Sequence, residues 1–352
     1  MPIHVVEPWT DARWDAYVAS HPRATVYHTS AWIRIVCEIG RYPSLCLIHE
    51  DDGRVTGILP LAAVESRLTG RRVCTLPFSD ECFALADTAE VARGLLAEAR
   101  AVRAHRGDDF YEMRGAPALR DGSAGPVEGF APQGHFHTYS LPLHGDPDAV
   151  LATFSKKAVR YMISRGQKLG VTIRAGDARD VADFYGLYIR TRRRHGVPPQ
   201  PRRLFELVLE RLQESPRATL YLAEHEGRAI AAAITIRYNG TTYLKYEVVD
   251  ETKRHLAPIH PLLWKSIEDA VAAGDRAYDF GRTAADNAGL NEFKGRWGTT
   301  RLELPYYFDP PTEGLSVVKS DSFKYRLFTT AFRRLPEAWA VRVGERIFRH
   351  FG

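Results

Sequence analysis

The same succession of strand and helix patterns occurs twice along this chain of 352 residues. In each half, two runs that alternate apolar and polar side chains meet at a glycine-containing turn, and a third run follows. These runs are residues 45–64 and 71–78 in the first half, and residues 220–238 and 241–249 in the second. A repeat of this length predicts a duplicated domain.

Each set of strands is followed by a helical pattern that leads into another short strand. Residues 91–107 and 261–274 have apolar residues at helical spacing. They end at Gly107 and Gly274, and glycine readily takes the left-handed conformation common at helix ends. Strands that alternate with helices in this way indicate an α/β fold. We therefore predict two similar α/β domains.

The duplication also sets the expected domain limits. We expect a first domain at residues 1–144, a second at 145–310, and a C-terminal helical segment at 311–352. The C-terminal segment is amphipathic and rich in cations, and we expect it to pack back on the first domain. Its alternative role is peripheral contact with an anionic membrane surface. The basic helical pattern at residues 155–170 is either a solvated face or a surface for phosphate or RNA.

Composition excludes several classes of protein. Hydrophobic residues make up 45% of the chain, which indicates a globular protein. The net charge of +5 suits an anionic partner without identifying one. The four cysteines form no CxxC pair, so we expect no metal site, no disulfide framework and no bound cofactor. Because no apolar run could span a membrane and no signal-peptide pattern is present, we expect a cytoplasmic protein; the oligomeric state stays open.

The densest cluster of chemically versatile residues is "DFGRTAADNAGLNEFKGRWGT", residues 279–299. It follows an expected strand end, and loops beyond strand ends of open α/β sheets often bind ligands. Lys294 and Arg296 flank Phe293 and Trp297, so a cation can bind a phosphate or carboxylate while the rings shape the pocket. The alternative is a solvated lysine on a helix whose aromatic residues belong to the core.

Three parts of the chain resemble the FemAB-related branch of the tandem GNAT-like acyltransferases. They are "HGVPPQPRRLFE", "DFGRT" with "DNAGLNEFKGRWGT", and the run "W…GRYPSLCLI…GRVTGILPL…LPFSDE", and the resemblance covers about residues 25–308. This family includes Fem-type enzymes, which add amino acids from aminoacyl-tRNA to the peptide of peptidoglycan precursors, and relatives linked to exopolysaccharide loci. The resemblance implies two tandem GNAT-like domains, with mixed central sheets flanked by helices, and an N-acyltransferase activity.

The resemblance also implies roles for individual residues. Lys294 matches the Fem-type lysine that holds the acceptor and assists at the transition state, and Phe293 matches its aromatic partner. Arg194 is similar to an arginine that grips acceptor phosphates, although His195 stands where the family has an acid. Arg34 is a looser match to a lysine that has the same role in the first domain.

Other polar residues complete the expected site. Glu247 lies on the strand before the second domain's helix, where simple GNAT enzymes often carry a carboxylate base, and Asp250 is its alternative. Either carboxylate can instead serve only to pair with a cation. We expect Asp279 and Arg282 to support the substrate site, and Asp80 to reach it from the first domain.

The loop before the second domain's helix bears on the acyl donor. A simple GNAT enzyme cradles the pyrophosphate of acetyl-CoA with backbone N–H groups of a glycine-containing loop at a helix N-terminus. Residues 250–265 contain no glycine, and Pro258 and Pro261 lack an N–H. Lys253 and Arg254 can still meet a phosphate through their side chains. The pattern favours an aminoacyl-tRNA donor, with acyl-CoA as the alternative.

The expected reaction is aminoacyl transfer to an amine of a peptidoglycan precursor or a similar anionic acceptor. Such a transfer needs orientation of the reactants, stabilisation of an oxyanion and removal of one proton, without a dedicated nucleophile. The first alternative is an acyl-CoA-dependent N-acyltransferase that acts on a sugar amine or another acceptor in exopolysaccharide or cell-envelope synthesis. The second is a non-catalytic protein that binds RNA or an envelope precursor.

Overall fold

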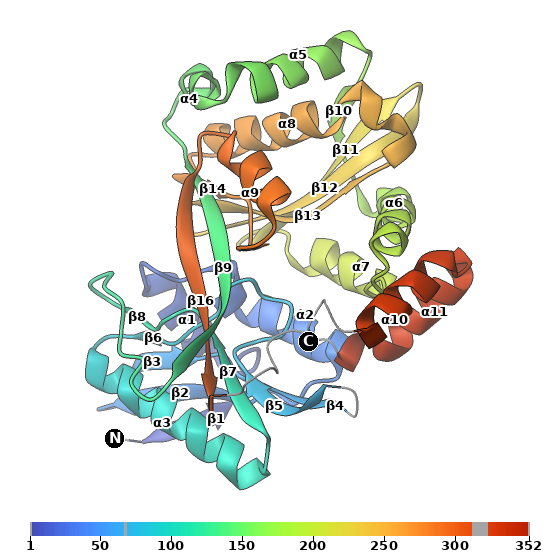
Figure 1. Ribbon diagram of the computed structural model, residues 1–352. Helices are drawn as coiled ribbons and strands as arrows, with labels where there is room; N and C mark the ends of the chain where they lie inside the picture. Colours follow the sequence, from blue (N-terminus) through green and yellow to red (C-terminus); the bar gives the residue numbers. More distant parts are fainter. Residues whose placement is uncertain (1, 67–68, 312–322, 351–352) are drawn as a thin grey trace. The chain divides into compact units, whose positions relative to one another are not determined.

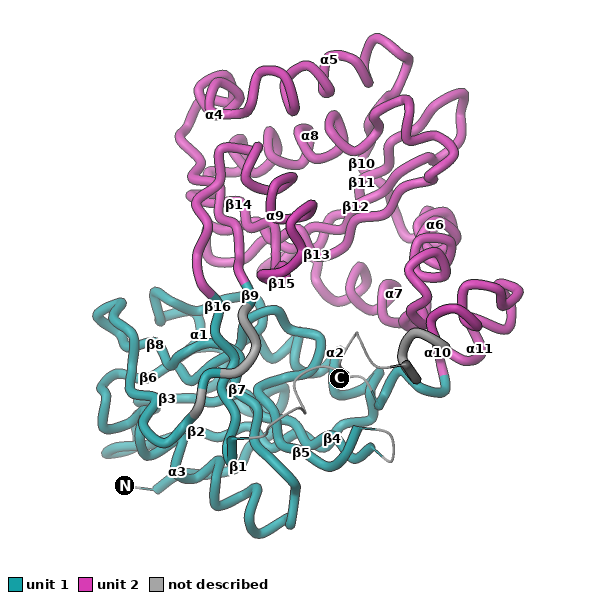
Figure 2. The backbone as a smooth tube through the Cα atoms, in the orientation of Figure 1, with its two compact units in different colours: residues 1–136, 304–325, 346–352 teal, residues 137–303, 326–345 magenta. Residues whose placement is uncertain are grey.

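The chain divides into two compact units (Figures 1 and 2). The computed structural model describes residues 2–66, 69–311 and 323–350. The first division falls inside strand β9 (Ala131–Pro142) and the second inside β16 (Thr300–Asp309), whereas the sequence places the domain limits at residues 144 and 310. Unit 1 comprises Met1–Phe136, Leu304–Tyr325 and Arg346–Gly352, and unit 2 comprises His137–Glu303 and Arg326–Glu345.

Unit 1 is built from two small groups of paired strands and three main helices. Strands pair in the order β1-β2-β3-β6-β8 in one group; in the other, β4 pairs with β5 and β7 lies between β5 and β16. The bounds are β1 (Ile3–Val6), α1 (Ala12–Ser20), α2 (Ser30–Gly40), β2 (Cys46–Asp51), β3 (Arg54–Leu59), β4 (Ala62–Ser66), β5 (Gly70–Cys74), β6 (Leu85–Ala86), α3 (Ala89–Arg106), β7 (Phe110–Arg114) and β8 (Ala118–Leu119).

The second strand run of the first half is divided at Pro60. Residues before it form β3 and residues after it form β4, and the two strands pair with different neighbours. Proline supplies no N–H for a strand ladder, so a break at this position is expected. Helix α3 begins at its predicted place, where the Thr88 side chain accepts from the Val91 N–H, and it ends at Gly107 with φ 65°.

Unit 2 has the same order of strands and helices, preceded by a helical stretch that covers α8 (Figure 1). Its strands follow the order β10-β11-β12-β13-β14-β9. The bounds are α4 (Pro147–Thr153), η2 (Lys156–Arg160), α5 (Tyr161–Lys168), β10 (Thr172–Ala175), α6 (Val181–His195), α7 (Arg202–Arg211), β11 (Arg217–His225), β12 (Arg228–Tyr238), β13 (Thr241–Val249), η4 (Glu251–Leu256), α8 (Ile259–Ala272), β14 (Ala277–Asp279), β15 (Thr283–Ala284) and α9 (Ala288–Gly295).

The two units share a strand–helix–helix–strand beginning and a helical crossover between parallel strands. Helix α3 joins β5 to β7, which pair in parallel, and α8 joins β13 to β14, which also pair in parallel. The duplicated α/β order predicted from the sequence is thus confirmed, and superposition of the two units stays a prediction. The paired helices α1 and α2 of unit 1, which correspond in order to α6 and α7, were not part of the expectation.

The C-terminal helices differ from the expectation. Helices α10 (Phe323–Arg334) and α11 (Glu337–Ile347) group mostly with unit 2, not with the first domain. Glycines permit this close packing: a Cβ on Gly344 would lie 2.3 Å from the Pro199 carbonyl oxygen. The ends of the segment belong to unit 1, including the final turn, η5 (Phe348–His350), where Phe348 stacks on Phe78 with ring centroids 4.2 Å apart.

The helices of the described ranges are not of the membrane-spanning kind. None of them combines the length and the apolar character that crossing a bilayer requires.

Candidate active site in unit 2

An opening between two parallel strands defines the candidate site. Strands β13 and β14 pair only from Thr241 and Ala277 to Tyr243 and Asp279, after which β14 ends while β13 continues to Val249. The register between β12 and β13 also shifts near this point, between Ile234 and Thr235. Ligand sites of open α/β sheets lie beyond the carboxyl ends of parallel strands, where neighbouring strands part.

Lys294 lies beside this opening, where its ammonium binds the loop that follows β14. Its side chain is only 6% exposed, and its Nζ donates hydrogen bonds to the carbonyl oxygens of Gly281 at 2.7 Å and Arg282 at 3.4 Å. The ammonium also lies 5.9 Å from the centroid of the Tyr139 ring. The lysine is therefore not the solvated surface residue of the alternative interpretation. A buried ammonium that is held in one position can act on charge that develops beside it.

Glu247 is the carboxyl group whose pKa the Lys294 ammonium influences. The surrounding protein disfavours the charged form and raises the pKa of the Glu247 carboxyl to about 7, while Lys294 and, more weakly, Arg254 act in the opposite direction. The side chain also has contact with solvent, which moderates the effect of burial. A carboxyl that titrates near neutral pH suits a general base.

Asp279 shapes the loop that receives Lys294. Its carboxylate accepts from the Thr138 hydroxyl at 3.0 Å and from the backbone N–H of Gly281. The position of Gly281, and with it the carbonyl that binds the ammonium, is therefore fixed by Asp279. The neighbouring Arg282 contributes its carbonyl oxygen to Lys294, and its side chain is exposed.

Residues of β9 support the site and were not anticipated from the sequence. Tyr139, whose ring lies near the ammonium, donates its hydroxyl to Asn291 Oδ1 at 2.8 Å. Asn291 in turn donates to the carbonyl oxygens of Ala284 and Ala285, both at 3.1 Å. This network fixes helix α9 against the β14 loop. The sequence carries no signal for it, because β9 and α9 are far apart along the chain.

Phe293 and Trp297 of the motif differ in how deeply they are buried. Trp297 is fully buried, and its ring belongs to the core of unit 2. The sequence-based expectation was that this ring contacts the substrate, but no part of it is exposed. Phe293 packs against Trp297 with ring centroids 6.0 Å apart and is only partly buried. His260, another residue that sequence reasoning missed, stacks on Trp297 at 5.8 Å. Burial and nearby Arg254 lower the pKa of His260 to about 4, so the imidazole is neutral at neutral pH.

Glu251 brings two of the expected phosphate-binding arginines together. Arg194 at the end of α6 forms an ion pair with Glu251, and Arg254 contacts the same carboxylate at 3.2 Å. Lys253 directly precedes Arg254 on the turn η4 and is partly buried. Asp250 caps this turn by accepting from the Thr252 N–H at 3.0 Å, which favours a structural role over that of a base.

Helix α5 packs closely against the turn that leads into α8. A Cβ added to Gly166 of α5 would lie 3.0 Å from both the Ala257 carbonyl oxygen and the Pro261 ring. Helix α8 begins at Pro258 without a side-chain cap, and Pro261 supplies no N–H. The backbone donors of a typical phosphate cradle are thus reduced, and α5 packs directly against the turn.

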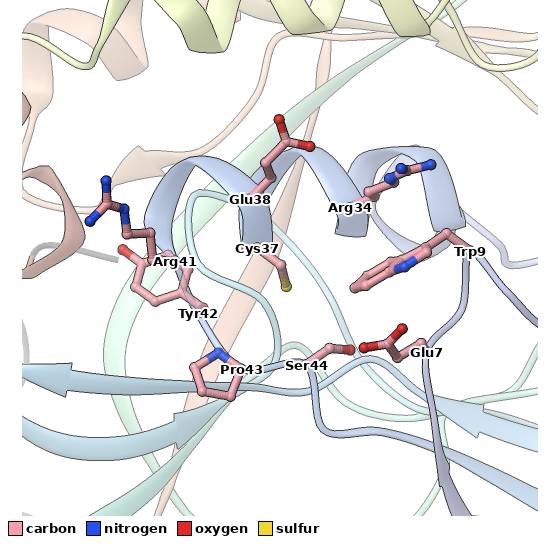
Figure 3. Close-up of a pocket in the computed structure, with 9 residues that line it drawn as sticks. All are labelled: Glu7, Trp9, Arg34, Cys37, Glu38, Arg41, Tyr42, Pro43 and Ser44. Atoms are coloured by element: carbon pink, nitrogen blue, oxygen red, sulfur yellow. The ribbon is translucent and has the colours of Figure 1, made fainter.

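The expected residues of the first domain lie in unit 1. Asp80 accepts from the Tyr27 hydroxyl at 3.0 Å, and its main-chain oxygen accepts from Tyr306 at 2.6 Å. Arg34 is exposed on α2 and lines a hollow of about 360 Å³ together with Trp9 (Figure 3). Neither residue belongs to unit 2, so their part in one shared site stays a prediction.

The strand opening of unit 1 is closed by its own side chains. Beyond the parallel pairing of β5 and β7, Arg114 donates to the carbonyl oxygens of Leu76 at 3.1 Å and Ser79 at 3.0 Å. The Trp32 indole N–H also donates to the Ser79 hydroxyl, at 2.9 Å. These contacts join the end of β7 to the loop that follows β5. Unit 2 is therefore the better candidate for chemistry.

Comparison with known proteins places these observations in a family. Residues 153–295 match the acetyltransferase (GNAT) domain. The solved structure of FemX has a TM-score of 0.67 and 16% identity over 88% of this chain and 97% of that one. L-PGS from Bacillus licheniformis has a TM-score of 0.54 and 11% identity, over 94% and 99% of the two chains.

A tandem GNAT protein from the clavulanic acid biosynthesis pathway gives a TM-score of 0.50 with 15% identity, over 89% of this chain and all of that one. A comparison with curated protein sequences found no match. Residues 153–295 therefore match a GNAT domain, and the whole chain has the fold of FemX and of the tandem GNAT protein. The family resemblance and the fold class expected from the sequence are confirmed.

Proposed function

We propose that this protein is an aminoacyltransferase that moves an aminoacyl group from aminoacyl-tRNA to an amine of an anionic cell-envelope precursor. The observation that carries the proposal is a buried ammonium at one strand opening, close enough to a carboxyl of raised pKa to influence its titration. Lys294 supplies the positive charge and Glu247 the base. The likeness of the fold to FemX and L-PGS supports an envelope role.

The proposed chemistry is attack of the acceptor amine on the ester carbonyl of the aminoacyl group. A C–N bond forms, the ester C–O bond breaks, and the electron pair of that bond leaves on the ribose oxygen of the RNA. Glu247 takes the proton that the amine loses, and the same proton passes to the leaving oxygen. Lys294 stabilises negative charge on the tetrahedral oxygen, as a preorganised cation in a partly dry site can.

The phosphate-binding turn supports RNA over CoA as the donor. Its prolines, Pro258 and Pro261, and the packing of Gly166 on the turn leave few backbone donors for a pyrophosphate. An aminoacyl-tRNA does not need this cradle, because its reactive ester lies at the end of a long polyanion. The alternative, an acyl-CoA donor, is favoured by one observation, the match of residues 153–295 to the acetyltransferase domain.

The arginines near Glu251 support an anionic acceptor. Arg194 and Arg254 share one carboxylate, so a phosphate that displaces Glu251 would meet two guanidinium groups already held together. Lys253 adjoins them on η4. We include Arg34 of unit 1 as a further acceptor contact, on the strength of the family resemblance.

A direct test compares donors under identical conditions. The protein is incubated with a peptidoglycan-precursor peptide and either a mixture of charged tRNAs or a panel of acyl-CoA thioesters, and products are identified by mass spectrometry. The proposal predicts a mass increase equal to one aminoacyl residue only with charged tRNA. Product only with acyl-CoA would support the alternative donor, and no product with either, together with tight precursor binding, would support a non-catalytic role.

A further inference from the structure

The helical stretch of η2 and α5 lies along the edge of unit 2 (Figures 1 and 2) and carries an unusual charge. Residues 155–170 contain no acidic side chain. We call the basic side chains of this stretch the α5 basic face. The face consists of Lys156, Lys157, Arg160, Arg165 and Lys168. At 1.5 Å per residue they extend over roughly 18 Å of helix.

None of these five cations forms an ion pair with a carboxylate of the described residues. Other arginines of unit 2 do so: Arg174 pairs with Asp180 at 2.7 Å, and Arg237 pairs with Asp275 at 2.7 Å. In addition, Arg160 Nε is buried and has no hydrogen-bond partner in the described structure. The face therefore carries uncompensated positive charge, which a polyanion would neutralise.

The apolar side of the same helical stretch packs into the core of unit 2. Val159 and Ile163 are buried in the core of unit 2, and Gly166 lies against the start of α8. The outward side thus offers charge together with two exposed apolar side chains, Tyr161 at 56% and Leu169 at 39%. A helix that binds in a membrane interface needs a free apolar face, which this one lacks. A nucleic acid backbone, by contrast, needs only cations and accepts an aromatic ring beside them.

The face is continuous with the turn that leads to the candidate site. Arg165 donates to the carbonyl oxygen of His255 at 3.4 Å, on the turn that also carries Lys253 and Arg254. The cations of α5 and those of η4 thus adjoin within unit 2. A polyanion that lies on α5 would have its end directed toward the turn beside Glu247, whose pKa Arg254 influences.

We propose that the α5 basic face binds the phosphodiester backbone of the RNA that carries the aminoacyl group. The inference rests on the proposed function for the identity of the RNA, and it adds the surface that receives it. It separates two tasks in the protein: α5 holds the RNA, and the strand opening performs the transfer.

The test uses a charge-removal variant and a matched control in the full chain. Lys156→Gln/Lys157→Gln/Lys168→Gln removes three exposed cations of the face, and Arg179→Gln/Arg202→Gln/Arg203→Gln removes three exposed cations that are already paired with acids. Binding of an uncharged RNA hairpin with an acceptor-stem sequence is measured over a range of salt concentrations. Thermal unfolding confirms that both variants fold.

The face variant is expected to bind the hairpin roughly 100-fold more weakly at 0.1 M salt, and to reduce the slope of log K against log salt by about 2 to 3. The control variant should change affinity by less than about 3-fold, because its cations are engaged by carboxylates. An unchanged slope in the face variant would overturn the proposal. So would binding of the wild-type protein to phosphatidylglycerol vesicles but not to the hairpin.

Transfer from a short aminoacyl-trinucleotide separates this inference from the proposed function. The small donor reaches the strand opening without needing α5, so the face variant should use it at the wild-type rate. If RNA binding depends on the face but no donor supports transfer, the proposed function fails while the docking surface stands. If transfer from charged tRNA proceeds equally in both variants, the docking surface fails while the proposed function stands.

Discussion

The Lys294 ammonium donates a 2.7 Å hydrogen bond to the main-chain oxygen of Gly281, in the loop that follows β14. The same loop is fixed from its other side by Asp279, which accepts from the Gly281 N–H. These contacts hold the ammonium in one position, so its charge does not need to be reoriented during a reaction. The geometry therefore suits stabilisation of negative charge in a reaction.

Replacing Lys294 with methionine tests this role while retaining the aliphatic stem. Turnover should fall by about 10² to 10³, the scale for losing one stabilising group. Because the Gly281 carbonyl would then lose its partner, the free energy of unfolding should also fall, by about 1 to 3 kcal/mol. Lys265→Met on α8 is the control, since its ammonium is half-exposed and pairs with Asp269. Steady-state kinetics and urea unfolding measure both effects; wild-type turnover would show that Lys294 is structural.

The pH dependence of the rate tests Glu247. A base with a pKa of about 7 must be deprotonated to act, so kcat/KM should rise with pH and level off above that value. Glu247→Gln should remove this rise and lower the rate by about 10² to 10⁴. A pH profile that is the same in the variant and the wild type would assign the titration to another group.

The same carboxyl should also affect stability in a defined direction. Its folded pKa is raised above the unfolded value, so the folded state holds the proton more tightly. The contribution is fully present below the unfolded pKa, near 4.3, and is lost as pH rises through about 7. Glu247→Gln should therefore gain stability relative to the wild type as pH rises from 5 to 8, measured by urea unfolding. The opposite trend would mean that the carboxylate is stabilised by its cationic neighbours.

Arg194 should act mainly through binding. Arg194→Ala is expected to raise KM for the acceptor more than it lowers kcat, because a phosphate clamp holds ground state and transition state alike. Arg179→Ala, whose side chain is 92% exposed, is the control and should leave both parameters unchanged. Equal losses in kcat and kcat/KM at Arg194 would place the residue in the transition state instead.

The shortage of backbone N–H donors at the start of α8 predicts weak binding of CoA. We expect a Kd for acetyl-CoA above about 0.1 mM, equivalent to a binding free energy weaker than roughly 5.5 kcal/mol. Isothermal titration calorimetry checks this value directly. Micromolar affinity, abolished by Arg254→Ala, would instead show that side chains replace the missing backbone donors.

The local parts of the fold were predictable, since strands such as β11–β13 and helices such as α8 carry their own periodicity and turn residues. Pro60 is a local signal for a break in one predicted strand, but the pairing of β3 and β4 with different neighbours depends on distant residues. The sequence left open whether Trp297 is buried, because its contact with Phe154 comes from a distant part of the chain.

The candidate site shows the same division between local and distant information. Lys294 and Phe293 were predicted from their motif, and Glu247 from its place on the strand before α8. Thr138 and Tyr139 could not be found, because they reach the site only through pairing of β9 with β14, where Ser140 lies opposite Asp279. Glu251 was missed because its role depends on two arginines from separate elements.

The most direct test of the central claim is single-turnover transfer from a radiolabelled aminoacyl-tRNA to a peptidoglycan-precursor peptide, with enzyme in excess. The wild-type protein should move the label to the peptide in one exponential phase, and Lys294→Met should bind the same tRNA with unchanged affinity yet transfer the label about 10² to 10³ times more slowly. Transfer at the same rate by both proteins, or label that stays on tRNA with the wild type, would contradict the assignment of the reaction to the β13–β14 opening.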